Sequence, residues 1–208
     1  MEHLRSKEYP EPPPEYQERG SFRRFVKDVL EIVLISLFLF LSINTITARI
    51  RVESVSMQPT LFAGNFVVVN KLSYQFGKPS RGDIIVFRYP PNPELDPYIK
   101  RVIGLPGDRL QVKQQKVFIN DKPYEDLHAY HREIPGTDPL IPRDDFGPVL
   151  VPEGHLFVMG DNRENSQDSR YWGFLDLKKV KGKALVIYWS WNALDDWVRA
   201  DRFGKVLE

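Results

Sequence analysis

A long apolar segment near the start of the chain places the strongest constraint on its fold. No charged residue occurs from Ile32 to Ala48, and counted from Val29 the run is about 20 residues long. As a helix it would measure about 30 Å, which is the thickness of the hydrocarbon core of a bilayer. We therefore predict a single transmembrane helix over residues 28–49.

The basic residues beside this segment predict its orientation. Four of them stand just before it: Arg19, Arg23, Arg24 and Lys27. Because Lys and Arg are enriched at the cytoplasmic end of membrane helices, we expect a cytoplasmic N-terminus and an extracytoplasmic chain after Arg49, anchored in the plasma or inner membrane. A cleavable signal peptide is one alternative, but Ile46 stands where a cleavage site needs a small residue. A buried core helix is another, and uniform hydrophobicity beside a basic flank argues against it.

The segments on either side of the predicted helix differ in composition. Residues 1–27 combine clustered prolines and glutamates with the basic flank, and we predict a disordered cytoplasmic tail. Residues 50–208 hold many of the chain's 17 Pro and 13 Gly, with short apolar runs between them that favour strands. Those runs are 66–72, 84–87, 110–112, 117–123 with a turn at Asn120–Asp121, 156–159 and 184–189.

These patterns predict a mainly β protein, in which a single transmembrane helix precedes an antiparallel β-fold domain at 50–208. Residues 109–155 would form a small inserted hairpin or subdomain, and 124–148 show no periodicity and are expected to be irregular. The net charge of +1, from 29 basic and 28 acidic residues, indicates no nucleic-acid partner. The sequence leaves the oligomeric state open.

Metal and cofactor sites have little support in the sequence. The chain has no cysteine, which excludes disulfides and thiolate metal sites. His128 and His131 are three residues apart in the irregular segment, but no acidic signature or third histidine accompanies them. We therefore expect neither a metal ion nor a cofactor.

A candidate nucleophile follows the predicted helix, in the segment Glu53–Leu61. Ser56 stands there two residues after Ser54, and a serine hydroxyl needs a base to take its proton. The four histidines are all distant in the sequence: His3, His128, His131 and His155. A lysine is the other candidate base, and Lys100 occurs inside an apolar run that closes in a turn reading Gly-Leu-Pro-Gly.

A lysine acts as a base only when its pKa falls. At a pKa of about 10.4, about one molecule in 2,500 is neutral at pH 7, and half-neutralisation requires a drop of about 3.4 units, or roughly 4.6 kcal/mol. Burial supplies such a shift because it penalises the ammonium form. Ile99, Val102 and Ile103 flank Lys100, whereas Arg101 would point to the opposite face of a strand. A solvated strand lysine is the plain alternative.

A third segment, Gly160–Gly173, reads Gly-Asp-Asn-Arg-Glu-Asn-Ser-Gln-Asp-Ser-Arg-Tyr-Trp-Gly. Taken with the segments around Ser56 and Lys100, it resembles the conserved motifs of the bacterial type I signal peptidases. The resemblance covers nearly all of the chain after the predicted helix, and the three motifs occur in the family order. It implies a membrane-bound serine endopeptidase with a Ser/Lys dyad, which removes N-terminal signal peptides from exported preproteins.

The resemblance also implies roles for individual residues. Ser56 would be the nucleophile and Lys100 the general base, with the Ser166 hydroxyl orienting the lysine amine. The backbone N–H of Ser56 and the hydroxyl of Ser54 would form the oxyanion hole, in which loss of one donor typically costs about 3 kcal/mol. Two ion pairs would support the site: Asp161 with Arg101, and Asp168 with Arg170.

Family members bind the preprotein as an extended strand before the cleavage site, with apolar pockets for small side chains such as Ala-x-Ala. The matched positions here are Val52, Met57, Leu61, Val67, Val86, Tyr98 and Ile99. Ordinary core packing is the alternative for each of them. Two positions depart from the family pattern, because Asn65 stands where many relatives have Asp and Pro97 is an additional residue before Tyr98.

Three other interpretations stay open. His155 and Asp161 could contribute to a Ser-His-Asp triad, although His155 follows a Pro-Glu-Gly turn and is more simply a strand cap. A self-cleaving Ser/Lys repressor would need a DNA-binding helical module where this chain has its apolar run. A membrane-tethered β domain that only binds extended peptides would share the groove but would need neither Ser56 nor Lys100.

Overall fold

The computed structural model describes residues 19–92, 94, 96–131, 145–192 and 197–207, and it separates the chain into two units between Ile43 and Asn44. The first unit holds most of helix α1 (Arg19–Ile46). Within α1, the candidate span Phe22–Ile46 contains an 18-residue window with a mean hydropathy of 2.3, and none of that window is buried by protein. By length and composition this helix can cross a membrane.

Helix α1 starts at Arg19 rather than at residue 28, and it ends at Ile46 rather than at residue 49. The basic flank is helical because arginine and lysine are good helix formers. The next residues belong instead to strand β1 (Thr47–Arg51), which pairs with β2 (Asn65–Asn70). Of the predicted tail, residues 19–27 are therefore helical, and 1–18 lie outside the described residues.

The second unit is built on an eight-stranded antiparallel sheet with the order β1-β2-β11-β3-β4-β9-β10, to which β12 adds through β11. Its further strands are β3 (Ile84–Phe87), β4 (Tyr98–Gly104), β9 (His155–Met159), β10 (Leu175–Asp176), β11 (Val180–Asn192) and β12 (Trp197–Val198). Register shifts in β11 let this long strand pair with β3 near its start and β2 further along. Short helices are α2 (Ser169–Trp172), η1 (Leu177–Lys179) and η2 (Ala200–Arg202).

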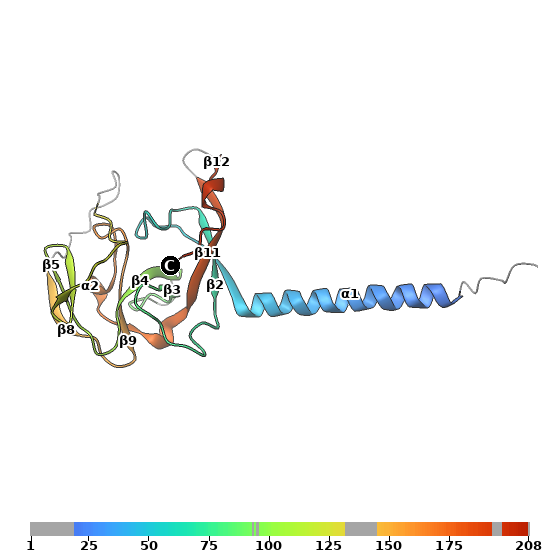
Figure 1. The fold of residues 1–208 in the computed structure, drawn as a ribbon, viewed down its shortest axis with the longest axis horizontal. Coiled ribbons are helices and arrows are strands. Elements are labelled where there is room, and N and C mark those ends of the chain that lie inside the picture. Colours follow the sequence, from blue (N-terminus) through green and yellow to red (C-terminus); the bar gives the residue numbers. More distant parts are fainter. Residues whose placement is uncertain (1–18, 93, 95, 132–144, 193–196, 208) are drawn as a thin grey trace, which may run out of the picture. The chain divides into compact units, whose positions relative to one another are not determined.

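A second, four-stranded sheet is inserted between β4 and β9. It has the order β7-β6-β5-β8, from β5 (Arg109–Lys113), β6 (Lys116–Ile119), β7 (Lys122–Pro123) and β8 (Phe146–Leu150). Figure 1 shows β5 and β8 side by side, away from β2 and β11. The predicted turn at Asn120–Asp121 joins β6 to β7, and a second turn at Gln114–Gln115 joins β5 to β6. All four turn residues have positive φ, as two-residue hairpins of this twist require.

The segment predicted to be irregular, 124–148, is only partly so. Its last residues begin β8, because Phe146 and Val149 pack against the apolar cluster that Leu110 and Val112 of β5 help to form. Tyr130 forms an isolated bridge with Asn162, and 132–144 lie outside the described residues.

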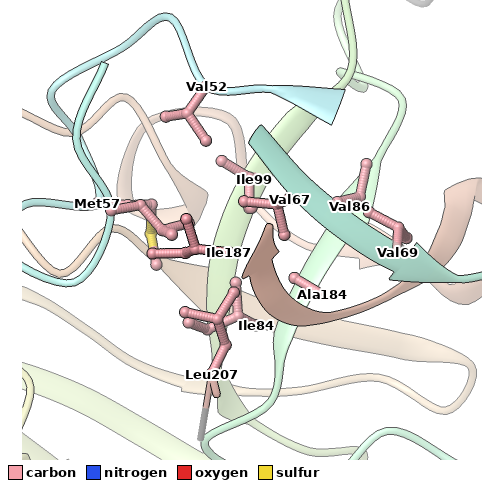
Figure 2. Close-up of a cluster of buried hydrophobic side chains, with 11 residues drawn as sticks. Val52, Met57, Val67, Val69, Ile84, Val86, Ile99, Ala184, Ile187 and Leu207 are labelled. Carbon is pink, nitrogen blue, oxygen red and sulfur yellow. The ribbon is translucent and has the colours of Figure 1, made fainter. Parts of the chain in front are cut away.

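Three apolar clusters hold the second unit together. The largest gathers side chains from β2, β3, β4 and β11 around the loop after β1 (Figure 2), and it contains Val52, Met57, Leu61, Val67, Val69, Ile84, Val86, Ile99, Ala184, Ile187 and Leu207. A second, with Ile103 and Phe157, joins the two sheets, and a third packs around Phe87 and Val158. The predicted fold class is therefore confirmed: an apolar N-terminal helix precedes a mainly antiparallel β domain with a small inserted sheet.

Candidate active site

Ser56 lies in the loop between β1 and β2. Two apolar residues of that loop, Met57 and Leu61, are fully buried in the largest cluster and anchor it. The Leu61 N–H donates to the Met57 carbonyl at 2.8 Å, and the Gln58 N–H donates to the Val55 carbonyl at 3.1 Å, so the backbone turns tightly around the serine. Ser56 itself is 5% exposed. The loop therefore presents its hydroxyl from a fixed backbone.

Lys100 approaches Ser56 from β4, a strand that is paired on both edges. It stands opposite Ile85 of β3, and β9 covers the other edge of β4. The Lys100 Nζ atom lies 2.5 Å from Ser56 Oγ, although the residues are 44 positions apart. The structure thus brings one amine and one hydroxyl into direct hydrogen-bond contact, the geometry that proton transfer requires.

The surroundings of Lys100 disfavour its charge. Burial lowers the pKa of Lys100 from its ordinary value of 10.5 to about 8, and Arg170 acts in the same direction. The carboxylates of Asp168 and Asp161 raise the pKa, but burial outweighs them. The residue is only 3% exposed, so water gives the ammonium form little compensation. A substantial neutral fraction therefore exists near neutral pH.

Ser54 lies beside the reacting pair. Its Oγ atom is 3.2 Å from Ser56 Oγ, and either hydroxyl can be the donor. If Ser56 Oγ attacks a carbonyl carbon, the resulting oxyanion lies two bonds from Oγ, within reach of a hydroxyl at this place.

Ser166 is fully buried under the Ser56 loop. Its Oγ accepts a hydrogen bond from the Gly160 N–H at 3.1 Å and donates to the carboxylate of Asp168. No hydrogen bond joins Ser166 to Lys100 among the described residues, and a direct contact with the amine stays a prediction.

An ion pair between Arg101 and Asp161 lies beneath the loop. Both side chains are fully buried, and two contacts join them, Nε to Oδ1 at 2.8 Å and Nη2 to Oδ2 at 2.9 Å. Arg101 also donates to the Gly82 carbonyl, and Thr60 donates to Asp161 Oδ2 at 2.6 Å. Because Thr60 belongs to the Ser56 loop, this pair connects the loop to β4.

A second ion pair joins Asp168 and Arg170. Asp168 Oδ1 accepts from Arg170 Nε and its Oδ2 accepts from Arg170 Nη2, both at 2.9 Å. Burial alone would raise the pKa of Asp168, but Arg170, Ser166 and the Gly160 N–H together lower it below its ordinary value. Asp168 also caps α2 through the Arg170 N–H, so the carboxylate is fixed and charged.

A groove of about 630 Å³ opens beside the pair. It is lined by Arg49, Ile50, Arg51, Val52, Glu53, Ser54, Ser56, Asp96, Pro97, Tyr98, Ile99, Lys100, Asn165 and Gln167. Of the seven predicted substrate contacts, Val52, Tyr98 and Ile99 line it directly. The other four, Met57, Leu61, Val67 and Val86, are fully buried in the apolar cluster behind it.

The groove also contains residues that the sequence did not single out. Asn165 and Gln167 flank Ser166, and their position in the same motif is the one signal that could have indicated them. Charged residues line it as well: Arg49, Arg51, Glu53 and Asp96. They are exposed, and nothing in their local sequence separates them from ordinary surface residues.

The three histidines in the described part of the chain contact residues other than Ser56. His155 begins β9, where its Nδ1 is 3.0 Å from the Glu153 carbonyl, whereas Asp161 is held by Arg101. A Ser-His-Asp triad is therefore not assembled from them. His131 Nδ1 lies 3.4 Å from Glu164 Oε1, and the His128 N–H donates a hydrogen bond to Asp126 Oδ1.

Comparisons with known proteins identify the family of this chain. The family described as signal peptidase, peptidase S26, matches residues 24–189. Signal peptidase I of Aquifex aeolicus is 37% identical over 79% of this chain and 84% of its own length, and that of Bacillus caldolyticus is 41% identical over 85% and 94%. A solved signal peptidase I from Enterococcus faecalis is 33% identical, covering 51% of this chain and 97% of that chain at a TM-score of 0.40. The chain therefore belongs to the signal peptidase family, peptidase S26.

Proposed function

We propose that this chain is a membrane-bound serine endopeptidase that cleaves N-terminal signal peptides from exported preproteins with Ser56 and Lys100 as its catalytic pair. Its relatives at 37% and 41% identity are signal peptidases, which supports the activity class. The observation that carries the residue assignment is the 2.5 Å contact between a buried amine and a hydroxyl. A domain that only bound peptides would not need to bury a lysine at such a cost.

The first half of the reaction forms an acyl-enzyme. Neutral Lys100 takes the proton of Ser56 as Oγ attacks the scissile carbonyl carbon. The oxyanion accepts hydrogen bonds from the Ser54 hydroxyl and the Ser56 N–H. The C–N bond then breaks, and the Lys100 ammonium returns the proton to the leaving amine, which is the N-terminus of the mature protein.

The second half releases the signal peptide. Lys100, neutral again, takes a proton from a water molecule that attacks the acyl carbon, and Ser56 leaves with the proton from the ammonium. Arg101 with Asp161 and Arg170 with Asp168 keep β4 and the Gly160–Gly173 segment in place during both steps. Ser166 contributes in two ways. Its hydroxyl holds the Asp168 carboxylate in place, and it orients the Lys100 amine when that amine moves during turnover.

The groove accounts for substrate choice. An extended peptide can lie between the segments around Val52 and Ile99, where main-chain hydrogen bonds give affinity. The four buried residues behind the groove (Met57, Leu61, Val67 and Val86) leave no depth for large side chains. Small residues before the cut are therefore preferred.

The membrane completes the proposal. Helix α1 spans the bilayer, with its basic start in the cytoplasm and the β domain outside, where signal peptides emerge. The predicted partners are thus signal-peptide-bearing preproteins and the lipid bilayer.

Cleavage by single-residue variants tests the catalytic pair. In detergent, Ser56→Ala and Lys100→Ala should each reduce preprotein cleavage by about 10⁴-fold or more, because the two residues act as a unit. Ser80→Ala and Lys113→Ala remove an exposed serine and an exposed lysine and should cleave like the wild type. Thermal unfolding of each variant checks that the fold is kept.

The same variants separate the alternatives. A peptide-binding domain without enzymatic activity predicts no cleavage by the wild type and unchanged peptide affinity in Ser56→Ala. Cleavage at the wild-type rate by either Ser56→Ala or Lys100→Ala would remove the Ser/Lys assignment.

A further inference from the structure

Part of the inserted region touches the back of the candidate active site. After β7, residues 126–131 of the insertion lie along residues 160–164 of the Gly160–Gly173 segment. We call 126–131 the buttress segment. Its contacts with 160–164 include two backbone hydrogen bonds, an ion pair between Asp126 and Arg163, and a contact between the His131 ring and Glu164.

The backbone contacts of the buttress segment centre on Tyr130. Its N–H donates to the Asp161 carbonyl at 2.8 Å, and its carbonyl accepts from the Arg163 N–H at 2.9 Å. This is the hydrogen-bond pattern of a parallel bridge around Asn162. Asn162 is therefore held from one side by the insertion, at a point where the 160–164 backbone has no strand partner of its own.

The side-chain contact of the buttress segment is a buried ion pair. Arg163 Nη2 contacts Asp126 Oδ2, and the two side chains are 3% and 7% exposed. The same guanidinium donates through Nε to the Gly160 carbonyl at 2.9 Å, and Arg170 Nη2 donates to the Arg163 carbonyl at 2.7 Å. Without Asp126, Arg163 would be a buried cation with no counter-charge in direct contact, a costly arrangement that favours movement towards water.

The opposite side of 160–164 supports the nucleophile. The Asn162 N–H donates to the Ser56 carbonyl at 3.0 Å, and its side chain reaches the Val55 carbonyl at 3.4 Å. Gly160 lies so close that a Cβ there would collide with the Ser56 carbonyl oxygen. The chain of contacts thus runs from Asp126 through Arg163 to Gly160 and Asn162, and from them to the backbone of Ser56.

We propose that Asp126 is a positioning residue for Ser56, acting through Arg163, and that the buttress segment is how the inserted region contributes to catalysis. This inference rests on the proposed function, because it assumes that Ser56 is the nucleophile. Displacement of a reacting atom by about 1 Å can cost about a hundredfold in rate, so a contact this remote from the chemistry can still limit turnover.

The test compares two isosteric variants of the insertion. Asp126→Asn removes the buried counter-charge, and Asp121→Asn removes an exposed one, since the Asp121–Arg109 pair is 72% and 52% exposed. For Asp126→Asn we expect kcat per folded molecule to fall about tenfold to a hundredfold with KM nearly unchanged. The apparent pKa in a plot of cleavage rate against pH should not change, because Asp126 is not among the charges that set the pKa of Lys100. Asp121→Asn should match the wild type.

Two further variants keep the test decisive. Asp126→Glu retains the charge and should recover part of the lost kcat, which a merely structural role would not predict. If Asp126→Asn does not accumulate as folded protein, Arg163→Lys carries the same expectation, because lysine cannot contact Asp126 and the Gly160 carbonyl together. A folded Asp126→Asn or Arg163→Lys protein with wild-type kcat overturns the inference while leaving the proposed function intact. Wild-type cleavage by Ser56→Ala would instead remove the proposed function.

Discussion

The chemistry of this site depends on a balance of charges around one amine. Lys100 has two carboxylates in its neighbourhood, and each of them is already paired with an arginine, Asp168 with Arg170 and Asp161 with Arg101. The carboxylates therefore raise the pKa of Lys100 less than burial lowers it, and the result is a pKa of about 8. Arg170 lowers the pKa of Asp168 below its ordinary value, and Arg101 holds the Asp161 side chain in place through its ion pair.

The pH dependence of cleavage follows from this pKa. Lys100 must be neutral to act as a base, so activity should rise with pH: kcat/KM should increase nearly tenfold per unit below pH 7 and level off above pH 9, with a midpoint at about 8. At pH 7 about one molecule in ten would be active. The check is a pH–rate profile of the purified protein with a preprotein substrate. A profile that is flat from pH 6 to 9, or a midpoint near 10.5, would contradict a buried lysine base.

At the residue scale the sequence indicated candidate residues but not the contacts between them. Ile99, Val102 and Ile103 indicated apolar surroundings for Lys100, yet the same pattern fits a solvated strand lysine. What buries the amine is the pairing of β4 with β3 and β9, which come from distant parts of the chain. The contact between Asp126 and Arg163 had no local signal at all, because it depends on how the insertion folds back.

At the scale of elements, the 160–164 backbone connects the segments that form the site. It lies between the Ser56 loop and the buttress segment, and it has hydrogen bonds to both. Gly160 permits this close approach, because a Cβ there would come closer to the Ser56 carbonyl oxygen and to Ser166 Oγ than real Cβ atoms do. A glycine is needed here for space, not for an unusual φ angle.

Alanine at Gly160 should therefore lower the activity, whereas alanine at a glycine remote from Ser56 should lower only the stability. Gly160→Ala forces the 160–164 backbone away from Ser56, and we expect kcat to fall about a hundredfold. Gly154→Ala is the matched control: its φ is +73° and nothing lies within 4 Å of a Cβ there, so it should lose about 1–2 kcal/mol of stability but no activity. Steady-state kinetics and denaturant unfolding of both variants provide the measurement. Equal kcat values for the two would show that Gly160 has no role in positioning Ser56.

The elements themselves were largely predictable, and the exceptions have physical causes. The run Ile84–Phe87 matches β3, because a short apolar run between turn residues is compatible with few structures other than a buried strand. Strand β11 is longer than the predicted 184–189, since its bulges let polar and charged residues such as Lys183 continue the pairing. Helix α1 stops at Ile46 because the residues after it pair with β2, a partner that local propensity cannot reveal.

At the scale of the whole molecule, the proposed function requires one orientation of the chain in the membrane. The β domain must lie on the side where signal peptides arrive, and α1 must cross the bilayer with its basic start in the cytoplasm. The basic residues at the start of α1 favour this orientation over its reverse. The β domain carries the complete set of proposed catalytic residues, so an inverted chain would have an intact site facing the wrong compartment.

The absence of cysteine from the chain makes this topology directly measurable. Ser6→Cys places a thiol before α1 and Lys122→Cys places one on exposed β7, each in an otherwise thiol-free protein. In intact spheroplasts a membrane-impermeant maleimide should label Lys122→Cys and leave Ser6→Cys unlabelled until the membrane is opened. Both variants should cleave preprotein normally, because Lys122 does not line the groove and Ser6 precedes the proposed membrane span. Labelling of Ser6→Cys alone in intact spheroplasts would mean the reverse orientation. Labelling of both would place the Ser6→Cys and Lys122→Cys thiols on the same outer side, as a fully translocated chain would require, and the single membrane span would have to be abandoned.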